Sequence, residues 1–143
     1  MTPPSTRWSN KATQSYRERM TQIFWAADVG DEWDAVRTEL TRAFQSSRAA
    51  AQADTSFVFV VRQDDLLGRR GPGNAMVATG LLSAARTAAI EGSRKGWTCN
   101  VIAYDDDEGR ATVERWAQHL LEDGSVSGEL IRVGPGHIGK ALP

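Results

Sequence analysis

Residues 71–103, GPGNAMVATGLLSAARTAAIEGSRKGWTCNVIA, decide the fold of this chain. A Gly-Pro-Gly turn opens the stretch, and about twenty residues without a helix breaker follow it. Gly92 and Gly96 end the helix that this pattern predicts, and Thr98–Ala103 has the apolar character of a short buried strand. A helix that leads directly into a buried strand is typical of a parallel α/β sheet.

The predicted helix is apolar around most of its circumference. Its polar residues Thr79, Ser83, Arg86 and Thr87 fall on one narrow stripe, and most of the others are Ala, Gly, Leu or Val. One sheet cannot cover so wide an apolar surface. We therefore expect this helix to pack on its own sheet and also on a second helix or subunit.

The remaining strands follow from apolar runs. Phe57–Val61 is continuously apolar, as expected of a strand covered on both faces of a parallel sheet. Shorter runs predict strands at Thr21–Ala27 and Ser127–Val133. With Thr98–Ala103, the pattern predicts an α/β fold: an open parallel sheet of about four strands with helices on both faces, in which Phe57–Val61 and Thr98–Ala103 are central.

Helical periodicity predicts two more long helices. Asp31 has the chemistry of an N-cap for a helix that extends to Gln52. A second helix is predicted around Val113–Leu121, and Arg62–Gly73 is expected to be a loop. Their predicted core faces include Trp33, Val36, Leu40, Ala43, Phe44, Val113, Trp116, Ala117 and Leu120.

The length of 143 residues suits one domain, which we place at residues 14–143 after a flexible polar segment, residues 1–13. A short helix is predicted at Gln14–Met20. The net charge of −1 gives no basic surface for nucleic acid or an anionic membrane. Neither a membrane span nor a hydrophobic signal region stands out, so we expect a cytoplasmic protein. The single cysteine, Cys99, lies in a predicted buried strand and is interpreted as a core residue.

The order of a Gly/Pro loop, a small-residue helix, Arg94-Lys95-Gly96 and a strand containing Asn100 resembles the C-terminal half of the short-chain dehydrogenases/reductases. Residues 31–51 are similar to the helix before the catalytic strand of that family, and residues 127–136 to its final strand. The resemblance covers roughly residues 22–140. It implies a fold like the C-terminal half of a Rossmann-type NAD(P)-binding reductase.

The catalytic positions of the family are degenerate in this sequence. Asn74 takes the place of the catalytic Tyr, Ala78 that of the Lys, and Glu39 that of the helix Asn. Val61 or Arg62 aligns with the Ser that holds the carbonyl. Hydride transfer in the family needs the Tyr, Lys and Ser groups, so the resemblance implies a pseudoenzyme with no catalytic residues.

The Gly-x-x-x-Gly-x-Gly turn of the cofactor-binding half is not found in the sequence. We therefore expect a truncated relative that binds no cofactor alone, with NAD(P) possible only in a partner subunit. In the resembled family the two long helices form a four-helix bundle across a twofold axis. We expect the same helices, Asp31–Gln52 and Asn74–Arg94, to bind a second copy or a full-length reductase. The expected interface residues are Leu40, Phe44, Ala78, Leu82, Ala85 and Ala89. A charged residue at Ala85 should then split the complex and leave the fold intact.

Two other functions remain open. Acidic residues follow several predicted strands, where ligands of open α/β sheets bind, so the chain could be a small enzyme or a metal-binding switch. It could also be a divergent oxidoreductase that is active only in a complex. Solvated loops are the preferred interpretation of the acids, and His119 and His137 are expected to be surface residues rather than metal ligands. The acids are Asp28, Asp64, Asp65, Asp105, Asp106 and Asp107.

Overall fold

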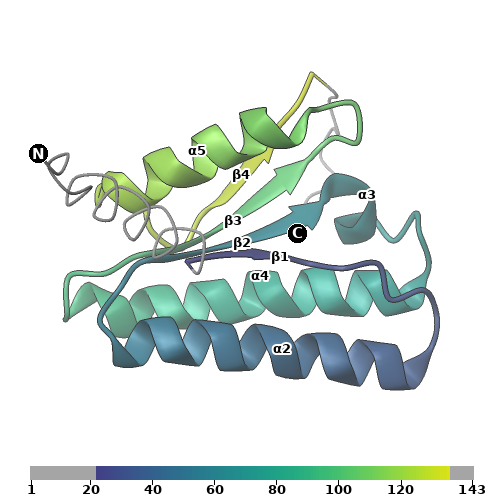
Figure 1. Cartoon of the computed structure of the whole chain (residues 1–143), viewed down its shortest axis with the longest axis horizontal. Helices are drawn as coiled ribbons and strands as arrows, with labels where there is room; N and C mark the ends of the chain where they lie inside the picture. The colour runs from purple at the N-terminus through teal and green to yellow at the C-terminus, as the bar shows by residue number, and fades with distance from the viewer. Residues whose placement is uncertain (1–21, 136–143) are drawn as a thin grey trace, which may run out of the picture.

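The computed structural model describes residues 22–135, and its four strands form one parallel sheet. The strands lie side by side in chain order (Figure 1). They are β1 (Ile23–Trp25), β2 (Phe57–Arg62), β3 (Cys99–Tyr104) and β4 (Leu130–Val133). The predicted open parallel α/β sheet is confirmed.

The two central strands are the apolar runs that the sequence indicates. β2 and β3 pair in parallel from Phe57 opposite Cys99 to Arg62 opposite Tyr104. Five of the six side chains in each strand are buried. A strand that is covered on both faces is largely apolar, which explains why these runs do not alternate with polar residues. The buried exception, Asn100 of β3, donates to the carbonyl of Val126 and accepts the N–H of Glu129.

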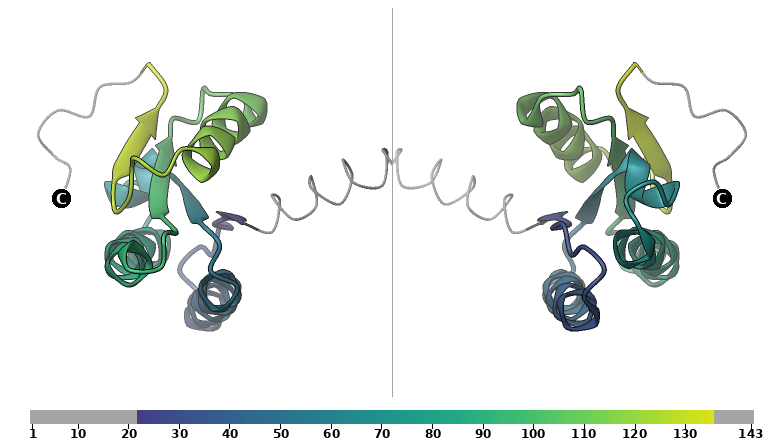
Figure 2. Two further views of the ribbon diagram at one scale, coloured as in Figure 1. Left: turned by 90° about the vertical axis from the view of Figure 1, so that its left-hand side faces the viewer. Right: turned by 90° about the vertical axis from the view of Figure 1, so that its right-hand side faces the viewer.

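Three long or medium helices cover the two faces of the sheet. Helices α2 (Trp33–Gln52) and α4 (Pro72–Ser93) lie side by side against one face, and α5 (Arg110–Glu122) crosses the other (Figures 1 and 2). The expected loop after β2 also contains a short helix, α3 (Gln63–Leu66), that the sequence analysis missed. None of the described helices combines the length and apolar composition that a transmembrane span requires.

Two separate cores result from the alternation of side chains along the strands. Phe57 and Phe59 point to the face covered by α2 and α4, and Val58 and Val60 join the core under α5. Successive residues of a strand point to opposite faces, so one short run supplies both cores. Cys99 lies in the first core, as predicted.

Helix α4 obtains its cover within the chain. Its residues Ala78, Leu82, Ala85 and Ala89 are all buried, most of them in the core shared with the sheet and α2. Leu40 of α2 lies against α4 beside Gly80, where an added Cβ would be 3.7 Å from a methyl carbon of Leu40. The expectation that α4 packs on the sheet and on a second helix is confirmed, and that helix is α2.

Several expectations about the helices are wrong. Asp31 is not the N-cap of α2: Glu32 occupies that position without a capping side-chain bond, and Asp31 instead reaches the backbone N–H of Gly73 at 3.5 Å. Trp33, Phe44 and Trp116, which were assigned to core faces, are 61%, 60% and 45% exposed. Periodicity places a residue on a helix face but cannot say where that face meets its neighbour. The expectations for residues 1–13, Gln14–Met20 and His137 lie outside the described residues.

Candidate functional site

Polar side chains gather where the strands end, on the side of the sheet that carries α3 in Figure 1. In open parallel sheets a ligand usually binds at the carboxyl ends of the strands. The loop after β1 supplies Asp28, α3 supplies Asp65, the loop before α4 supplies Arg70, and the first turn of α4 supplies Asn74. We refer to these four residues as the strand-end cluster.

Arg70 links the two carboxylates of the strand-end cluster. Its Nη2 lies 2.7 Å from Asp28 Oδ2, and its Nε lies 3.4 Å from Asp65 Oδ1. The second contact is within ion-pair distance but is not a hydrogen bond, so Asp65 Oδ1 and Arg70 Nη1 are buried without hydrogen-bond partners among the described residues. Burial raises the pKa of Asp65 above its usual value, and the charge of Arg70 opposes that shift.

The side-chain amide of Asn74 forms hydrogen bonds with the backbone and side chains around it. Its Oδ1 accepts the backbone N–H of Val29 at 3.0 Å, and its Nδ2 donates to Asp28 Oδ1 at 3.0 Å and to the Arg70 carbonyl at 3.4 Å. The hydrogen bond from Asn74, the N–H of Gly30 and the charge of Arg70 lower the pKa of Asp28. Asn74, which the sequence analysis aligns with the catalytic Tyr of the resembled family, therefore ties the loop after β1 to the start of α4.

The loop after β1 lies directly on the start of α4. A Cβ added to Gly73 would collide with the carbonyl oxygen of Gly30, and that clash involves backbone that cannot turn aside. Glycine at this position permits the close approach. The loop and the helix terminus thus touch through their backbones, next to the bonds that Asn74 makes.

A second group of polar and aromatic residues lies at the same strand ends, toward α5. Arg62 Nε donates to Tyr104 Oη at 3.2 Å and lies 3.7 Å from Asp106 Oδ1. The ring of Tyr104 is 5.8 Å from that of Trp25, and the guanidinium of Arg110 lies 4.1 Å above Trp25. Such stacking holds the ends of three strands against the first turn of α5.

The structure separates the four residues that the sequence analysis aligns with catalytic positions of the resembled family. Val61 and Ala78 are buried in the apolar core between the sheet and the α2/α4 pair. Glu39 is 5% exposed, accepts the backbone N–H of Ala27 at 3.0 Å and pairs with Arg42. Of the four, Asn74 alone belongs to the strand-end cluster.

The acidic residues predicted at the strand ends are mostly paired with arginines. Besides the pairs already described, Asp64 lies 3.1 Å from Arg69. Asp105 accepts the N–H of Asp107 in a local turn. In residues 22–135, no three His, Cys, Asp or Glu side chains come together as a possible metal site. The sequence analysis named the acids but not their pairing with Arg62 and Arg70, although a basic residue in the same loop as a strand-end acid is the available signal.

Cys99 and His119 occupy the environments expected for them. Burial raises the pKa of the Cys99 thiol to about 12, so this side chain behaves as a small core residue. His119 is exposed on α5, 4.0 Å from Asp123. Neither residue faces the strand-end cluster from a position that suggests catalysis.

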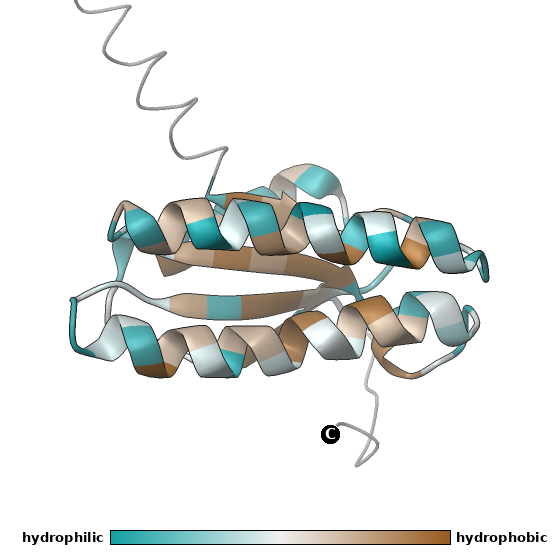
Figure 3. Cartoon of the chain, turned by 90° about the horizontal axis from the view of Figure 1, so that it is seen from below, coloured by the Kyte–Doolittle hydropathy of each residue, from teal (hydrophilic) through white to brown (hydrophobic). Residues whose placement is uncertain are grey.

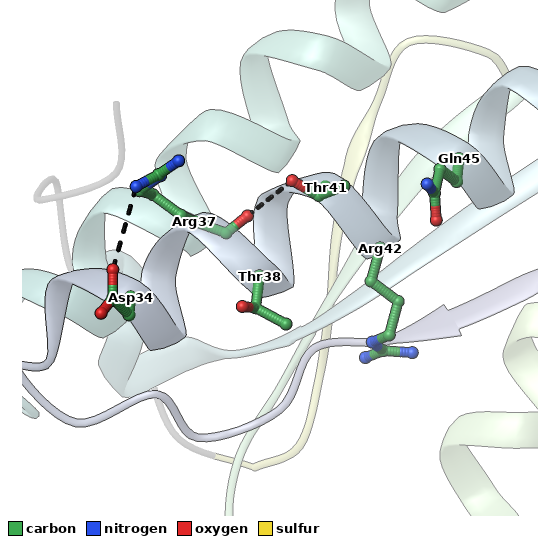
Figure 4. Close-up of a pocket in the computed structure, with 6 residues that line it drawn as sticks. All are labelled: Asp34, Arg37, Thr38, Thr41, Arg42 and Gln45. Carbon is green, nitrogen blue, oxygen red and sulfur yellow. Dashed lines mark hydrogen bonds and ion pairs between the residues drawn. The ribbon is translucent and has the colours of Figure 1, made fainter.

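A shallow hollow runs along the outer side of α2 (Figure 4). Its lining residues all come from this helix, and Figure 4 shows Arg42 directed from the helix toward β1. Arg37 forms a loose ion pair there with Asp34, 3.9 Å apart. The hollow is lined by Asp34, Arg37, Thr38, Thr41, Arg42 and Gln45.

No protein-family model and no curated protein matches the sequence. The fold does match solved structures. Enoyl-acyl-carrier-protein reductase of Plasmodium berghei, solved with triclosan, is 16% identical with a TM-score of 0.59, over 78% of this chain and 55% of that one. A putative 3-oxoacyl-reductase of Bacillus thuringiensis is 17% identical with a TM-score of 0.62, over 90% and 72% of the two chains.

A third similar structure is 4-hydroxyisoleucine dehydrogenase in complex with NADH and succinate. It is 12% identical with a TM-score of 0.57, over 93% of this chain and 77% of that one. The chain thus spans about half the length of the first of these enzymes and about three quarters of the other two. At such identities the likeness shows the fold, which is similar to that of the short-chain dehydrogenase/reductase type.

Proposed function

We propose that this chain is a catalytically inactive relative of the short-chain dehydrogenases/reductases that acts as an assembly subunit. It binds through α2 and α4 to a second copy of itself or to an active reductase, as a structural or regulatory partner. The observation that carries the proposal is the exposure of large apolar side chains on these two helices. They are Trp33 and Phe44 on α2 and Met76 and Ile90 on α4.

The four exposed residues lie on two neighbouring stripes. With about 3.6 residues per turn, Trp33 and Phe44 share the face of α2 that carries Leu40. Met76 and Ile90 share the face of α4 that carries Gly80 and the exposed polar residues Thr79, Ser83 and Thr87. Leu40 and Gly80 are where the two helices meet. Figure 3, which looks at both helices from outside the sheet, shows α2 as mostly hydrophilic with a few hydrophobic segments and α4 with more of them. We call this the α2/α4 surface.

An apolar surface of this kind favours association. Burial of apolar area contributes about 25 cal/mol per Å², so a partner that covers these four side chains gains stability. Two parallel helices of 20 and 22 residues offer enough length for a stable interface, which typically buries ~1,600 Å² in total.

The structure retains some of the interface residues that the sequence predicts and replaces others. Phe44 is exposed and Leu40 half-buried, so both remain in the α2/α4 surface. Ala78, Leu82, Ala85 and Ala89 are buried within the chain and cannot contact a partner. Trp33, Met76 and Ile90 take their place in the proposal.

The contacts of the degenerate family positions support the inactivity that we propose. A reductase of the resembled type needs a free Tyr hydroxyl and a nearby Lys at the positions of Asn74 and Ala78. Here the Asn74 amide is consumed by three hydrogen bonds, and Ala78 is a core residue. We expect the chain alone to bind no NAD(P) and to reduce no carbonyl, which cofactor titration by calorimetry and a turnover assay check.

Assembly is tested by the mass of the purified chain in light scattering after size exclusion. Phe44→Arg should abolish self-association, while Gln45→Arg, the same change on the exposed neighbouring position, should not. If the wild type is monomeric, the test becomes retention of an active reductase from the native cell by the wild type and its loss with Phe44→Arg. A monomer that retains no reductase contradicts the proposal.

A further inference from the structure

β1 is an edge strand in the described part of the chain, where it pairs with β2 alone. Ala26 donates its N–H to the carbonyl of Val60 at 2.9 Å, so the backbone groups of Ala26 face β2. Because successive residues of an extended chain direct their backbone groups to opposite edges, those of Ile23 and Trp25 in β1, and of Ala27 just beyond it, face away from the sheet. Such outward groups are a template for an added strand.

Two side chains of α2 form hydrogen bonds with two of these outward backbone groups. Glu39 Oε1 accepts the N–H of Ala27 at 3.0 Å, and Arg42 Nη2 donates to the carbonyl of Trp25 at 2.8 Å. The same two side chains are bound to each other, with Arg42 Nε 3.1 Å from Glu39 Oε2 and a second contact between Nη2 and Oε1. Their spacing of three residues places them on the same face of the helix.

The pattern of these bonds is that of one residue in a neighbouring parallel strand. Such a residue donates its N–H to the carbonyl of one residue and accepts the N–H of the residue two positions further on. Val60 accepts the N–H of Ala26 in this way on the inner side of β1. The Glu39–Arg42 pair supplies the same donor and acceptor, to Trp25 and Ala27, on the outer side.

We propose that Glu39 and Arg42 form an edge cap that takes the place of one residue of an adjoining strand and closes β1 to an extended chain. Glu39 anchors the cap from the buried side, and Arg42, whose side chain is 49% exposed, completes it from the solvent side. Glu39 is buried, and the guanidinium of Arg42 lies 4.0 Å from the ring centroid of Phe24. An extended segment that paired along β1 would have to displace both side chains, so the edge cap directs association away from this edge.

The test compares Arg42→Ala with Arg37→Ala, which removes an arginine from the same helix that pairs with Asp34 and not with β1. Hydrogen exchange of the Ile23 and Trp25 amides is followed at low and high protein concentration, together with the mass in solution. Arg42→Ala should associate as concentration rises and gain protection at these two amides, whereas the wild type and Arg37→Ala should show no such gain. This readout is separate from the α2/α4 surface, which contains neither amide.

Two further variants keep the test decisive. Arg42→Lys preserves the charge but can reach only one of the two groups that Arg42 binds, the Trp25 carbonyl and the Glu39 carboxylate. It should therefore show the same gain in protection more weakly, and it replaces Arg42→Ala if that variant fails to fold. Glu39→Ala should speed exchange of the Ala27 amide by about fivefold to tenfold, the effect of one lost hydrogen bond. Unchanged exchange at Ile23 and Trp25 in both Arg42 variants, at every concentration, would overturn the edge cap.

Discussion

Asn74 Oδ1 accepts the backbone N–H of Val29 at 3.0 Å, although the two residues are 45 positions apart in the chain. Both groups are buried, and the bond ties the loop after β1 to the first turn of α4. Asn74 therefore fixes this loop against the helix at the carboxyl ends of the strands, where ligands of open parallel sheets usually bind.

The first prediction is that Asn74→Ala lowers the free energy of unfolding by about 1–3 kcal/mol, because the buried N–H of Val29 is left without a partner. Urea denaturation measures the change. Thr79→Ala is the matched control on the same helix, since its hydroxyl bonds the Ala75 carbonyl at an exposed position and its loss should cost no more than ~0.5 kcal/mol. Equal effects of the two variants would contradict the structural role of Asn74.

The second prediction concerns the loss of stability in acid. The pKa of Asp28 is lowered from 3.8, first by the hydrogen bond from Asn74, so its ionised form stabilises the fold. This contribution is present above pH 3.8 and is lost as the pH falls through the lower pKa of the folded state. As the pH falls from 7 to below the folded-state pKa of Asp28, the free energy of unfolding should therefore decrease less in Asp28→Asn than in the wild type.

The pKa of Asp65 is shifted in the opposite direction, so this residue serves as the control for Asp28. Its pKa is raised by burial, so its ionised form disfavours the fold, and stability is regained as the pH falls through the raised value. Asp65→Asn should make the acid loss steeper, where Asp28→Asn makes it shallower. Denaturant titrations at several pH values decide between these signs, and the same shift in both variants would be incompatible with them.

The third prediction is that Cys99 is unreactive in the folded chain. Burial raises its pKa to about 12, and the thiolate is the form that attacks alkylating reagents. Labelling with iodoacetamide at pH 8 should be far slower than for the urea-unfolded chain and should follow the unfolded fraction as urea is added. Rapid labelling without urea would mean that the strand opens readily.

The fourth prediction replaces an expectation that the structure contradicts. Ala85 is 1% exposed, so Ala85→Arg buries an unpaired charge in the core and should destabilise the chain by more than about 3 kcal/mol rather than only split a complex. Ile90→Arg places the same side chain on a residue that is 72% exposed, and the fold should survive. Circular dichroism with thermal melting separates the two; a folded Ala85→Arg variant would refute the burial of this position.

Local sequence is enough to predict the elements that form the sheet. Phe57–Val61 is apolar throughout, and Thr98–Ala103 is apolar except for Thr98 and Asn100, because parallel strands are covered on both faces. This pattern is visible without any knowledge of neighbours. The helix-favouring stretch between the Gly71-Pro72-Gly73 turn and Gly92, in which Gly80 is the single glycine, likewise predicts α4. The buried position of Cys99 follows from its strand.

The tertiary structure decides which predicted faces are buried and what the polar residues do. Trp33 and Phe44 lie on a periodic apolar face, yet both remain exposed because α2 meets α4 and the sheet through other residues. The bonds of Asn74 to Val29, and of Glu39 and Arg42 to β1, join residues 12 to 45 positions apart. Periodicity describes one element at a time, whereas these contacts depend on how two elements are placed against each other by the packing of the core.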